Sequence, residues 1–178
     1  MIKIIAGKLK GRKLSTINID NVRPTQAKVR KSMMDSIRTF ENKTILDLFS
    51  GAGTLGIEAI SRGAKKVKFI DNNNSAISIL KKNILLLDLT EKSSISKIDA
   101  MEFLKRDRNT YDIIFADPPY RKYKFEDLLP YASKLLNQNG LFCFESNRYP
   151  ITIEENDYFK IKKYGNVQVA FWRNIIWK

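Results

Sequence analysis

Residues 44–56 read Thr44-Ile-Leu-Asp-Leu-Phe-Ser-Gly51-Ala-Gly-Thr-Leu-Gly56 and join an apolar run to a glycine-rich turn. The run from Thr44 to Phe49 predicts a buried strand, and residues 55–62 have the spacing of a helix. A glycine-rich turn between a strand and a helix lets a ligand approach the backbone closely. The segment therefore predicts an α/β fold with a ligand at this turn. Taken alone, the G-x-G-x-x-G pattern is weak evidence for a nucleotide site, because glycines that only pack a helix against a strand produce the same pattern.

Outward from this segment, apolar runs alternate with helical spacing. Residues 74–87 and 125–136 have the spacing of amphipathic helices. The further runs that predict buried strands are Lys66–Asp71, Ser94–Ile98, Tyr111–Asp117 and Leu141–Glu145. Strands that alternate with helices predict a parallel sheet covered on both faces. Near the end, Tyr158–Tyr164 and Val167–Trp172 flank Gly165-Asn166, which predicts an antiparallel hairpin that closes the sheet.

A smaller unit is predicted ahead of this sheet. Lys3–Ala6 and Arg12–Thr16 are expected to pair as a hairpin around two glycines. Arg23-Pro-Thr25 predicts the start of a helix that runs to about Phe40. The inward stripe of that helix is Val29, Met33, Met34 and Ile37. At 178 residues, the chain is long enough for one full hydrophobic core.

The positive charge of the chain is unevenly spread. The net charge is +13, yet 43% of the residues are hydrophobic, which is too many for a disordered chain. Residues 1–43 hold eleven Lys and Arg against three acidic residues, a net charge of +8. A polyanion is the expected partner; the alternative is an AT-rich genome that raises lysine content throughout. We therefore divide the chain into a basic N-terminal extension, residues 1–43, and a main domain, residues 44–178.

The composition also excludes several classes of chemistry. Cys143 is the only cysteine and histidine is absent, so the sequence offers no disulfide framework, no Cys/His zinc site and no histidine base. Chemistry must use carboxylates, amides, tyrosine or a cofactor. No apolar run approaches the roughly 20 residues that span a bilayer, and the apolar start is too short for a signal peptide. We expect a cytoplasmic protein without a membrane partner.

Two further aspartates follow predicted strands. Asp71 ends a strand about 20 residues beyond the glycines, where a carboxylate would bind the ribose hydroxyls of an adenosine-containing cofactor. Asp99 follows the next strand and could accept a hydrogen bond from an adenine amino group. The alternative for Asp99 is a helix N-cap, with Glu102 completing a capping box, and the two roles do not exclude each other.

The most specific signal is Asp117-Pro-Pro-Tyr120, directly after a predicted strand. An exocyclic base nitrogen is a poor nucleophile because its lone pair is delocalised into the ring, so its methylation needs two acceptors aimed at its two hydrogens. The Asp117 carboxylate and the Pro118 carbonyl would supply them, and Tyr120 offers a ring for an extruded base. No strong base is required, because the nitrogen becomes acidic once methylated. The alternative is a Pro-Pro turn that ends a strand, with Tyr120 in the core.

These motifs together resemble the class I S-adenosylmethionine-dependent methyltransferases that modify base amino groups. Lys3-Ile-Ile-Ala-Gly7, Lys10-Gly-Arg-Lys-Leu14 and Arg23-Pro-Thr25 with Val29-Arg30 resemble the opening of the bacterial 16S ribosomal RNA guanine-N2 methyltransferase family. The resemblance covers nearly the whole chain. It implies a Rossmann-like fold whose mostly parallel seven-stranded sheet ends in a C-terminal antiparallel hairpin.

The resemblance also implies roles for individual residues. The residues implied to bind S-adenosylmethionine are Asp47, Gly51 and Gly53 at its methionine end, Asp71 at its ribose and Asp99 at its adenine. The residues implied to hold the guanine are Asp117, Pro118 and Tyr120. The product would be S-adenosylhomocysteine, and no metal would be needed.

The implied partner is 16S ribosomal RNA, in the 30S subunit or an assembly intermediate, bound by a monomer. The residues implied to contact its phosphates are Lys10, Arg12, Lys13, Arg23 and Arg30. The chain departs from the family at Ala27 and Lys31, where the family usually has acidic residues. Both departures fall near the expected RNA-binding surface.

Three other functions account for parts of the sequence. A DNA adenine-N6 methyltransferase would use the same motifs, but the sequence has no obvious target-recognition domain. A dinucleotide oxidoreductase explains the glycines and Asp71 and leaves Asp117 to Tyr120 unused. A non-catalytic RNA-binding module explains the charge alone.

Overall fold

The computed structural model describes residues 2–16, 24–119, 122–153, 156 and 158–175. Within these residues, seven strands form one sheet in the order β5-β4-β3-β6-β7-β9-β8. The strands are β3 (Thr44–Leu48), β4 (Lys66–Asp71), β5 (Ser93–Lys97), β6 (Tyr111–Ala116), β7 (Leu136–Asn147), β8 (Phe159–Tyr164) and β9 (Val167–Arg173). Strands β3 to β7 pair in parallel, and β9 pairs antiparallel with β7 and β8. The predicted parallel sheet with a closing hairpin is confirmed.

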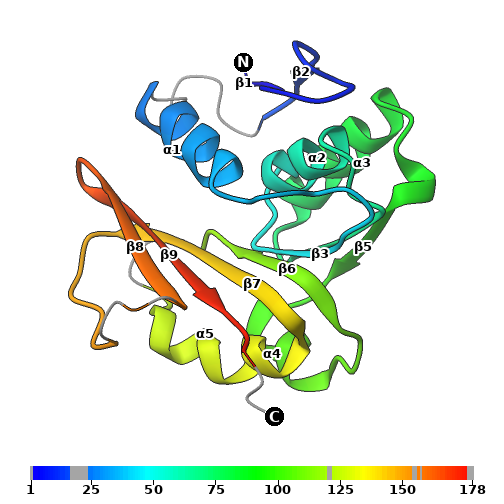
Figure 1. The fold of residues 1–178 in the computed structure, drawn as a ribbon. Helices are drawn as coiled ribbons and strands as arrows, with labels where there is room; N and C mark the ends of the chain where they lie inside the picture. Colours follow the sequence, from blue (N-terminus) through cyan, green and yellow to red (C-terminus); the bar gives the residue numbers. More distant parts are fainter. Residues whose placement is uncertain (1, 17–23, 120–121, 154–155, 157, 176–178) are drawn as a thin grey trace.

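Helices cover both faces of the sheet, so the sheet is the middle of three layers (Figure 1). The helices on one face are α1 (Pro24–Asp35), α2 (Thr54–Ser61) and α3 (Asn74–Leu86); those on the other are α4 (Ala100–Arg106) and α5 (Phe125–Ala132). Each face encloses its own hydrophobic cluster. Alternate residues of each central strand enter opposite clusters: in β6, Ile113 and Phe115 face α1 to α3, whereas Ile114 and Ala116 face α4 and α5.

The strand order creates a crevice at one edge of the sheet. Strand β3 pairs with β4 on one side and with β6 on the other. The chain after β3 therefore first adds strands on the β4 side and then crosses back to add β6 on the opposite side. In open parallel sheets, ligands bind where the strand order reverses, beyond the carboxyl ends of the strands. The glycine turn after β3 and the Asp-Pro-Pro segment after β6 both lie at this edge.

Two predicted helices are too long. Helix α1 ends at Asp35 instead of running to Phe40, because the Ser36 amide and hydroxyl both bind the Ser32 carbonyl and the Ile37 amide binds Met34, tightening the last turn. Helix α5 ends at Ala132, and a 3₁₀ turn, η3 (Ser133–Leu135), leads into β7.

Two predicted strands also differ from the structure. Strand β7 begins at Leu136, five residues earlier than predicted, and contains Asn139 with a positive φ of 61°. Strand β5 is an edge strand of half-buried and exposed residues, not the buried strand we predicted. A 3₁₀ turn, η2 (Thr90–Lys92), precedes it.

The N-terminal segment packs on the main domain. Its short strands β1 (Ile2–Lys3) and β2 (Lys13–Leu14) confirm the predicted hairpin, and Ile4 and Leu14 share a hydrophobic cluster with the sheet. The buried Glu58 carboxylate in α2 accepts hydrogen bonds from the amides of Ile5, at 2.7 Å, and Ala6, at 3.0 Å. Helix α2 therefore fixes this hairpin through polar contacts as well as apolar ones.

Candidate active site

The glycine turn between β3 and α2 is shaped by left-handed backbone and by one buried carboxylate. Gly51 and Gly53 have φ values of 54° and 82°, which favour glycine. Asp47, only 1% exposed, accepts a hydrogen bond from the Gly56 amide at 2.9 Å. Burial raises the pKa of Asp47 to about 8. Asp47 thus supports the turn from behind, and it does not line the cavity described below.

Asp71, at the end of β4, connects the glycine turn to the start of α3. Its carboxylate accepts hydrogen bonds from the Gly51 amide at 2.8 Å and from the Asn73 amide at 2.8 Å. Carboxylate oxygens have two lone pairs each, so acceptor capacity remains for a ligand hydroxyl. The predicted ribose-binding aspartate therefore lies beside the predicted glycine.

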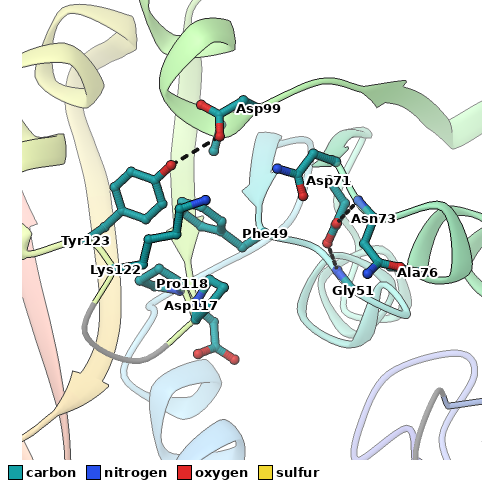
Figure 2. Close-up of a pocket in the computed structure, with 13 residues that line it drawn as sticks. Phe49, Gly51, Asp71, Asn73, Ala76, Asp99, Asp117, Pro118, Lys122 and Tyr123 are labelled. Carbon is teal, nitrogen blue, oxygen red and sulfur yellow. Dashed lines mark hydrogen bonds between the residues drawn. The ribbon is translucent and has the colours of Figure 1, made fainter.

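A cavity of about 420 Å³ opens at this edge of the sheet. Its lining residues are Phe49, Gly51, Asp71, Asn72, Asn73, Ala76, Asp99, Ala100, Asp117, Pro118, Pro119, Lys122 and Tyr123. The structure thus gathers five residues predicted from separate parts of the sequence: Gly51, Asp71, Asp99, Asp117 and Pro118 (Figure 2). The predicted Gly53 instead packs against α3, where an added Cβ would lie 2.4 Å from a Leu80 methyl carbon.

Asp99 caps α4 and also reaches across the cavity. One carboxylate oxygen accepts hydrogen bonds from the Met101 amide at 2.9 Å and the Glu102 amide at 3.2 Å. The other accepts a hydrogen bond from the Tyr123 hydroxyl at 3.1 Å (Figure 2). The N-cap role is confirmed, whereas the Glu102 carboxylate pairs with Arg106 at 2.7 Å. The adenine contact stays a prediction.

Asp117 and Pro118 lie at the carboxyl end of β6, at the cavity edge nearest to β7. The Asp117 side chain is exposed, while Pro118 is buried, so the acceptor is open and its loop is held firmly. The carboxylate points away from Tyr123 and Asp99, towards the sheet face covered by α1 (Figure 2). Although accessible, it sits deep among protein atoms, and this desolvation raises the pKa of Asp117. The predicted Tyr120 lies outside the described residues.

Eight of the lining residues were not among the predicted site residues: Phe49, Asn72, Asn73, Ala76, Ala100, Pro119, Lys122 and Tyr123. Phe49, with a positive φ of 57°, and Tyr123 place their rings 5.1 Å apart at the cavity wall. Lys122 and Asn72 also line it. A non-glycine residue in the left-handed region is unusual, but no sequence pattern predicts that Phe49 adopts this conformation. Tyr123 lies in a segment without periodicity, so nothing in the sequence connected it with Asp99.

The predicted RNA-contacting residues fall into two groups. Lys10, Arg12 and Lys13 are exposed on the N-terminal hairpin, and Arg12 donates a hydrogen bond to the Leu86 carbonyl at 3.4 Å. Arg30 instead donates to the Lys3 carbonyl at 3.1 Å, and its Nε is buried. This inward placement favours a role within the fold over a phosphate contact for Arg30. Arg23 lies outside the described residues.

The donor and acceptor set of the cavity fits an adenosine-containing cofactor. Asp71 presents a carboxylate to the cavity beside the Gly51 turn, and an added Cβ at Gly51 would meet no atom within 4 Å. The space beside this backbone is therefore open to a ligand. Phe49 and Ala76 add apolar surface, and cavities of this size hold small cofactors.

The profile of the family described as "Conserved hypothetical protein 95" matches residues 2–173. Ribosomal RNA small subunit methyltransferase D of Buchnera aphidicola (subsp. Acyrthosiphon pisum) is 35% identical over 170 residues, which cover 93% of this chain and 88% of that protein. The protein of the same name from Haemophilus influenzae is 32% identical over 181 residues, 97% of this chain and 94% of that protein. The chain belongs to the small subunit methyltransferase D family.

The fold agrees with this family. The solved structure of YhhF from Escherichia coli has a TM-score of 0.85 and is 27% identical, and the match covers 98% of each chain. HI0767 from Haemophilus influenzae has a TM-score of 0.77 at 28% identity. The Rossmann-like class I fold expected for the small subunit methyltransferase D family is therefore confirmed.

Two absences can be stated for the described part of the chain. No cluster of three or more Cys, Asp or Glu side chains there is arranged to hold a metal ion. Within the same residues, no helix has the length and apolarity needed to cross a bilayer.

Proposed function

We propose that the protein transfers a methyl group from S-adenosylmethionine to the exocyclic N2 of one guanine, of the guanine 966 type, in 16S ribosomal RNA. The observation that carries this proposal is that Asp117 and Pro118 line the same cavity as Asp71 and Gly51. A base-amine acceptor pair thus adjoins a cofactor-type cavity. The names of the relatives from Buchnera and Haemophilus support RNA over DNA as the substrate. S-adenosylhomocysteine is the expected product.

The chain's own residues would bind and orient both reactants. The cofactor, when bound, supplies a methyl group activated on a sulfonium. Asp71 and the Gly51 turn hold the adenosine portion, with Phe49 against its apolar surface. Asp117 and the Pro118 carbonyl accept the two N2 hydrogens and so direct the nitrogen lone pair towards the methyl group. The Asp117 carboxylate, already desolvated, is placed to receive the proton released after transfer.

A first prediction concerns Asp71. Replacing it with asparagine removes the charge that strengthens hydrogen bonds to ribose hydroxyls, so we expect the dissociation constant for S-adenosylmethionine to rise about 10- to 100-fold. Isothermal titration calorimetry measures this directly. Glu91→Gln, which likewise turns a carboxylate into an amide at an exposed residue beside the amino end of β5, is the control and should leave the constant unchanged. An equal affinity in the Asp71 variant would remove this residue from the cofactor site.

The RNA footprint proposed here is the N-terminal extension, residues 1–43, on which Lys10, Arg12 and Lys13 are exposed. These side chains lie on the hairpin that α2 fixes to the main domain, so their positions relative to the cavity are set by the fold. The proposed partner is the 30S subunit or an assembly intermediate, bound by a monomer in the cytoplasm.

A second prediction tests this footprint by salt dependence. Removing a phosphate contact releases one counterion fewer, so single alanine variants at Lys10, Arg12 or Lys13 should each reduce the slope of log affinity against log salt by about 1. Fluorescence anisotropy with labelled RNA measures the slope between low and moderate salt. Lys134→Ala, on the α5 side of the sheet, removes an equal charge elsewhere and should leave the slope unchanged. Slopes that match wild type in all three variants would place the footprint elsewhere.

The decisive experiment is transfer of radiolabelled methyl from S-adenosylmethionine to 30S subunits from a strain lacking its own guanine-N2 enzyme. Nucleoside analysis should find N2-methylguanosine at one position of 16S RNA. Label absent from RNA but present as N6-methyladenine in DNA would keep the catalytic role of Asp117 and overturn the substrate. Label in neither nucleic acid would overturn the proposed function.

A further inference from the structure

Glu145 lies next to Asp117 on the same face of the sheet. Strands β6 and β7 run in parallel, with Ala116 paired to Phe144, so the following residues, Asp117 and Glu145, are neighbours across the two strands. Phe144 points to the α5 side, and by alternation Glu145 points to the side of α1. The negative charge of Asp117 acts on the pKa of Glu145, as expected for close carboxyl groups.

Glu145 is nearly buried and has no hydrogen-bond donor among the residues that the structure describes. Its exposure is 7%, whereas the three residues before it in β7 are 0% exposed. Among the described residues, none donates a hydrogen bond to its carboxylate or forms an ion pair with it within 4 Å. Burial and the charge of Asp117 raise the pKa of Glu145, and the charge of Arg30 lowers it.

Ionising a nearly buried carboxyl group next to a second carboxylate is costly, because desolvation and like-charge repulsion both oppose the charge. Asp117 also lacks a hydrogen-bond donor among the described residues. Within the described part of the chain, the pair therefore presents a row of acceptors that no donor satisfies. A ligand with a matching row of donors would satisfy both groups, and this is the chemistry by which a buried polar site selects its substrate.

The Watson–Crick edge of guanine has such a row. Guanine carries the N1 hydrogen directly beside the N2 amine, whereas adenine has an unprotonated N1 that a carboxylate would repel. Strand β7, which carries Glu145, lies next to β6 in the sheet, so a base with N2 at Asp117 and N1 turned towards β7 would meet Glu145. We propose that Glu145 accepts the N1 hydrogen of the target base and thereby selects guanine over bases that lack it. This inference rests on the proposed function and adds to it the group that reads the base.

Arg30 lies close enough to Glu145 for its charge to act on that carboxyl group. Its guanidinium is held by the Lys3 carbonyl at 3.1 Å, and it lies near Glu58 as well as Glu145. The positive charge of Arg30 opposes, without cancelling, the upward shift that burial and Asp117 impose on the pKa of Glu145. Helix α1 thus contributes a charge to the site as well as apolar contacts.

The test compares guanine with 2-aminopurine, which keeps the C2 amine but has an unprotonated N1. Particles of the 30S type are reconstituted from ligated 16S RNA with either base at the target position, and kcat/KM is measured for each. In Glu145→Gln the side chain can donate to an unprotonated N1, so the preference for guanine over 2-aminopurine should fall at least about tenfold. The comparison of one enzyme on two bases cancels any general loss of activity.

Controls separate this role from a structural one. Glu91→Gln should keep the wild-type ratio, and the affinity of Glu145→Gln for S-adenosylmethionine should stay within about threefold of wild type. If the Gln variant is inactive on both bases, the preference is measured in Glu145→Ala. For an inactive variant, the preference is taken from the dissociation constants of the two particles, measured with S-adenosylhomocysteine present, and it should again fall. An unchanged ratio in a variant that still binds or methylates RNA overturns the inference alone. A wild-type enzyme that methylates neither particle overturns the proposed function and this inference together.

Discussion

Asp117→Ala is expected to lower kcat by about 100- to 1,000-fold, the usual effect of removing one group that stabilises the transition state. The affinity for S-adenosylmethionine should change by less than about threefold, because Asp71 and the Gly51 turn bind the cofactor by contacts that Asp117 does not make. Single-turnover methyl transfer gives the rate, and calorimetry gives the affinity. Equal losses of rate and affinity would contradict the acceptor role of Asp117.

The pH dependence of the same variant series gives an independent check. Although the Asp117 side chain is accessible, the surrounding protein atoms desolvate its carboxylate and raise its pKa to about 6. The ionised form is the stronger acceptor and the form that can take the released proton, so wild-type kcat/KM should rise with pH below this pKa and level off above it. Asp117→Asn keeps one acceptor oxygen and cannot ionise, so it should be slow and lack this rise. A rise retained in the Asn variant would assign the titration to another group.

Glu58→Ala is expected to destabilise the protein by about 3 kcal/mol, measured as the free energy of unfolding in urea. The substitution leaves the Ile5 and Ala6 amides without an acceptor and removes one of two ion-pair partners of the Arg62 guanidinium, the other being Asp35. Glu58 is 1% exposed, so water cannot replace it readily. The hairpin that carries Lys10 and Arg12 should loosen, and RNA affinity should fall with stability.

Glu102→Ala is the matched control for this change. Glu102 also pairs with an arginine four residues later, but both side chains are largely exposed, and such pairs contribute about 0.5 kcal/mol. If the two variants lose equal stability, the hairpin is held by apolar contacts of Ile4 and Leu14 instead of by Glu58.

The main features of the site could be predicted because they depend on chain order. Asp71 and Asp117 each follow a run whose composition predicts a strand, and parallel strands bring their carboxyl ends to one edge. Glu145 could not be predicted in the same way. It ends the run Leu141 to Glu145, which is buried on both faces, and such a run does not reveal which residue faces which helix.

Residues whose roles depend on tertiary contacts were harder to predict. Arg30 read as one more basic residue of the extension, and only its contact with the Lys3 carbonyl shows that it turns inward. The resemblance implied a cofactor contact for Asp47, whereas in the structure its carboxylate is buried and accepts a hydrogen bond from the Gly56 amide. The end of α1 depends on bonds made by Ser36, which a helical periodicity does not reveal.

The strand order has a consequence for the behaviour of the chain in a crowded cell. The sheet ends in β5 on one side and β8 on the other, and the exposed edges of such strands are where separate protein chains pair and aggregate. Both carry exposed lysines: Lys97 in β5, and Lys160, Lys162 and Lys163 in β8. Two copies that met edge to edge would bring like charges together. The lysine-rich composition that suits an RNA-binding protein therefore also opposes the pairing of sheet edges between two copies of the chain.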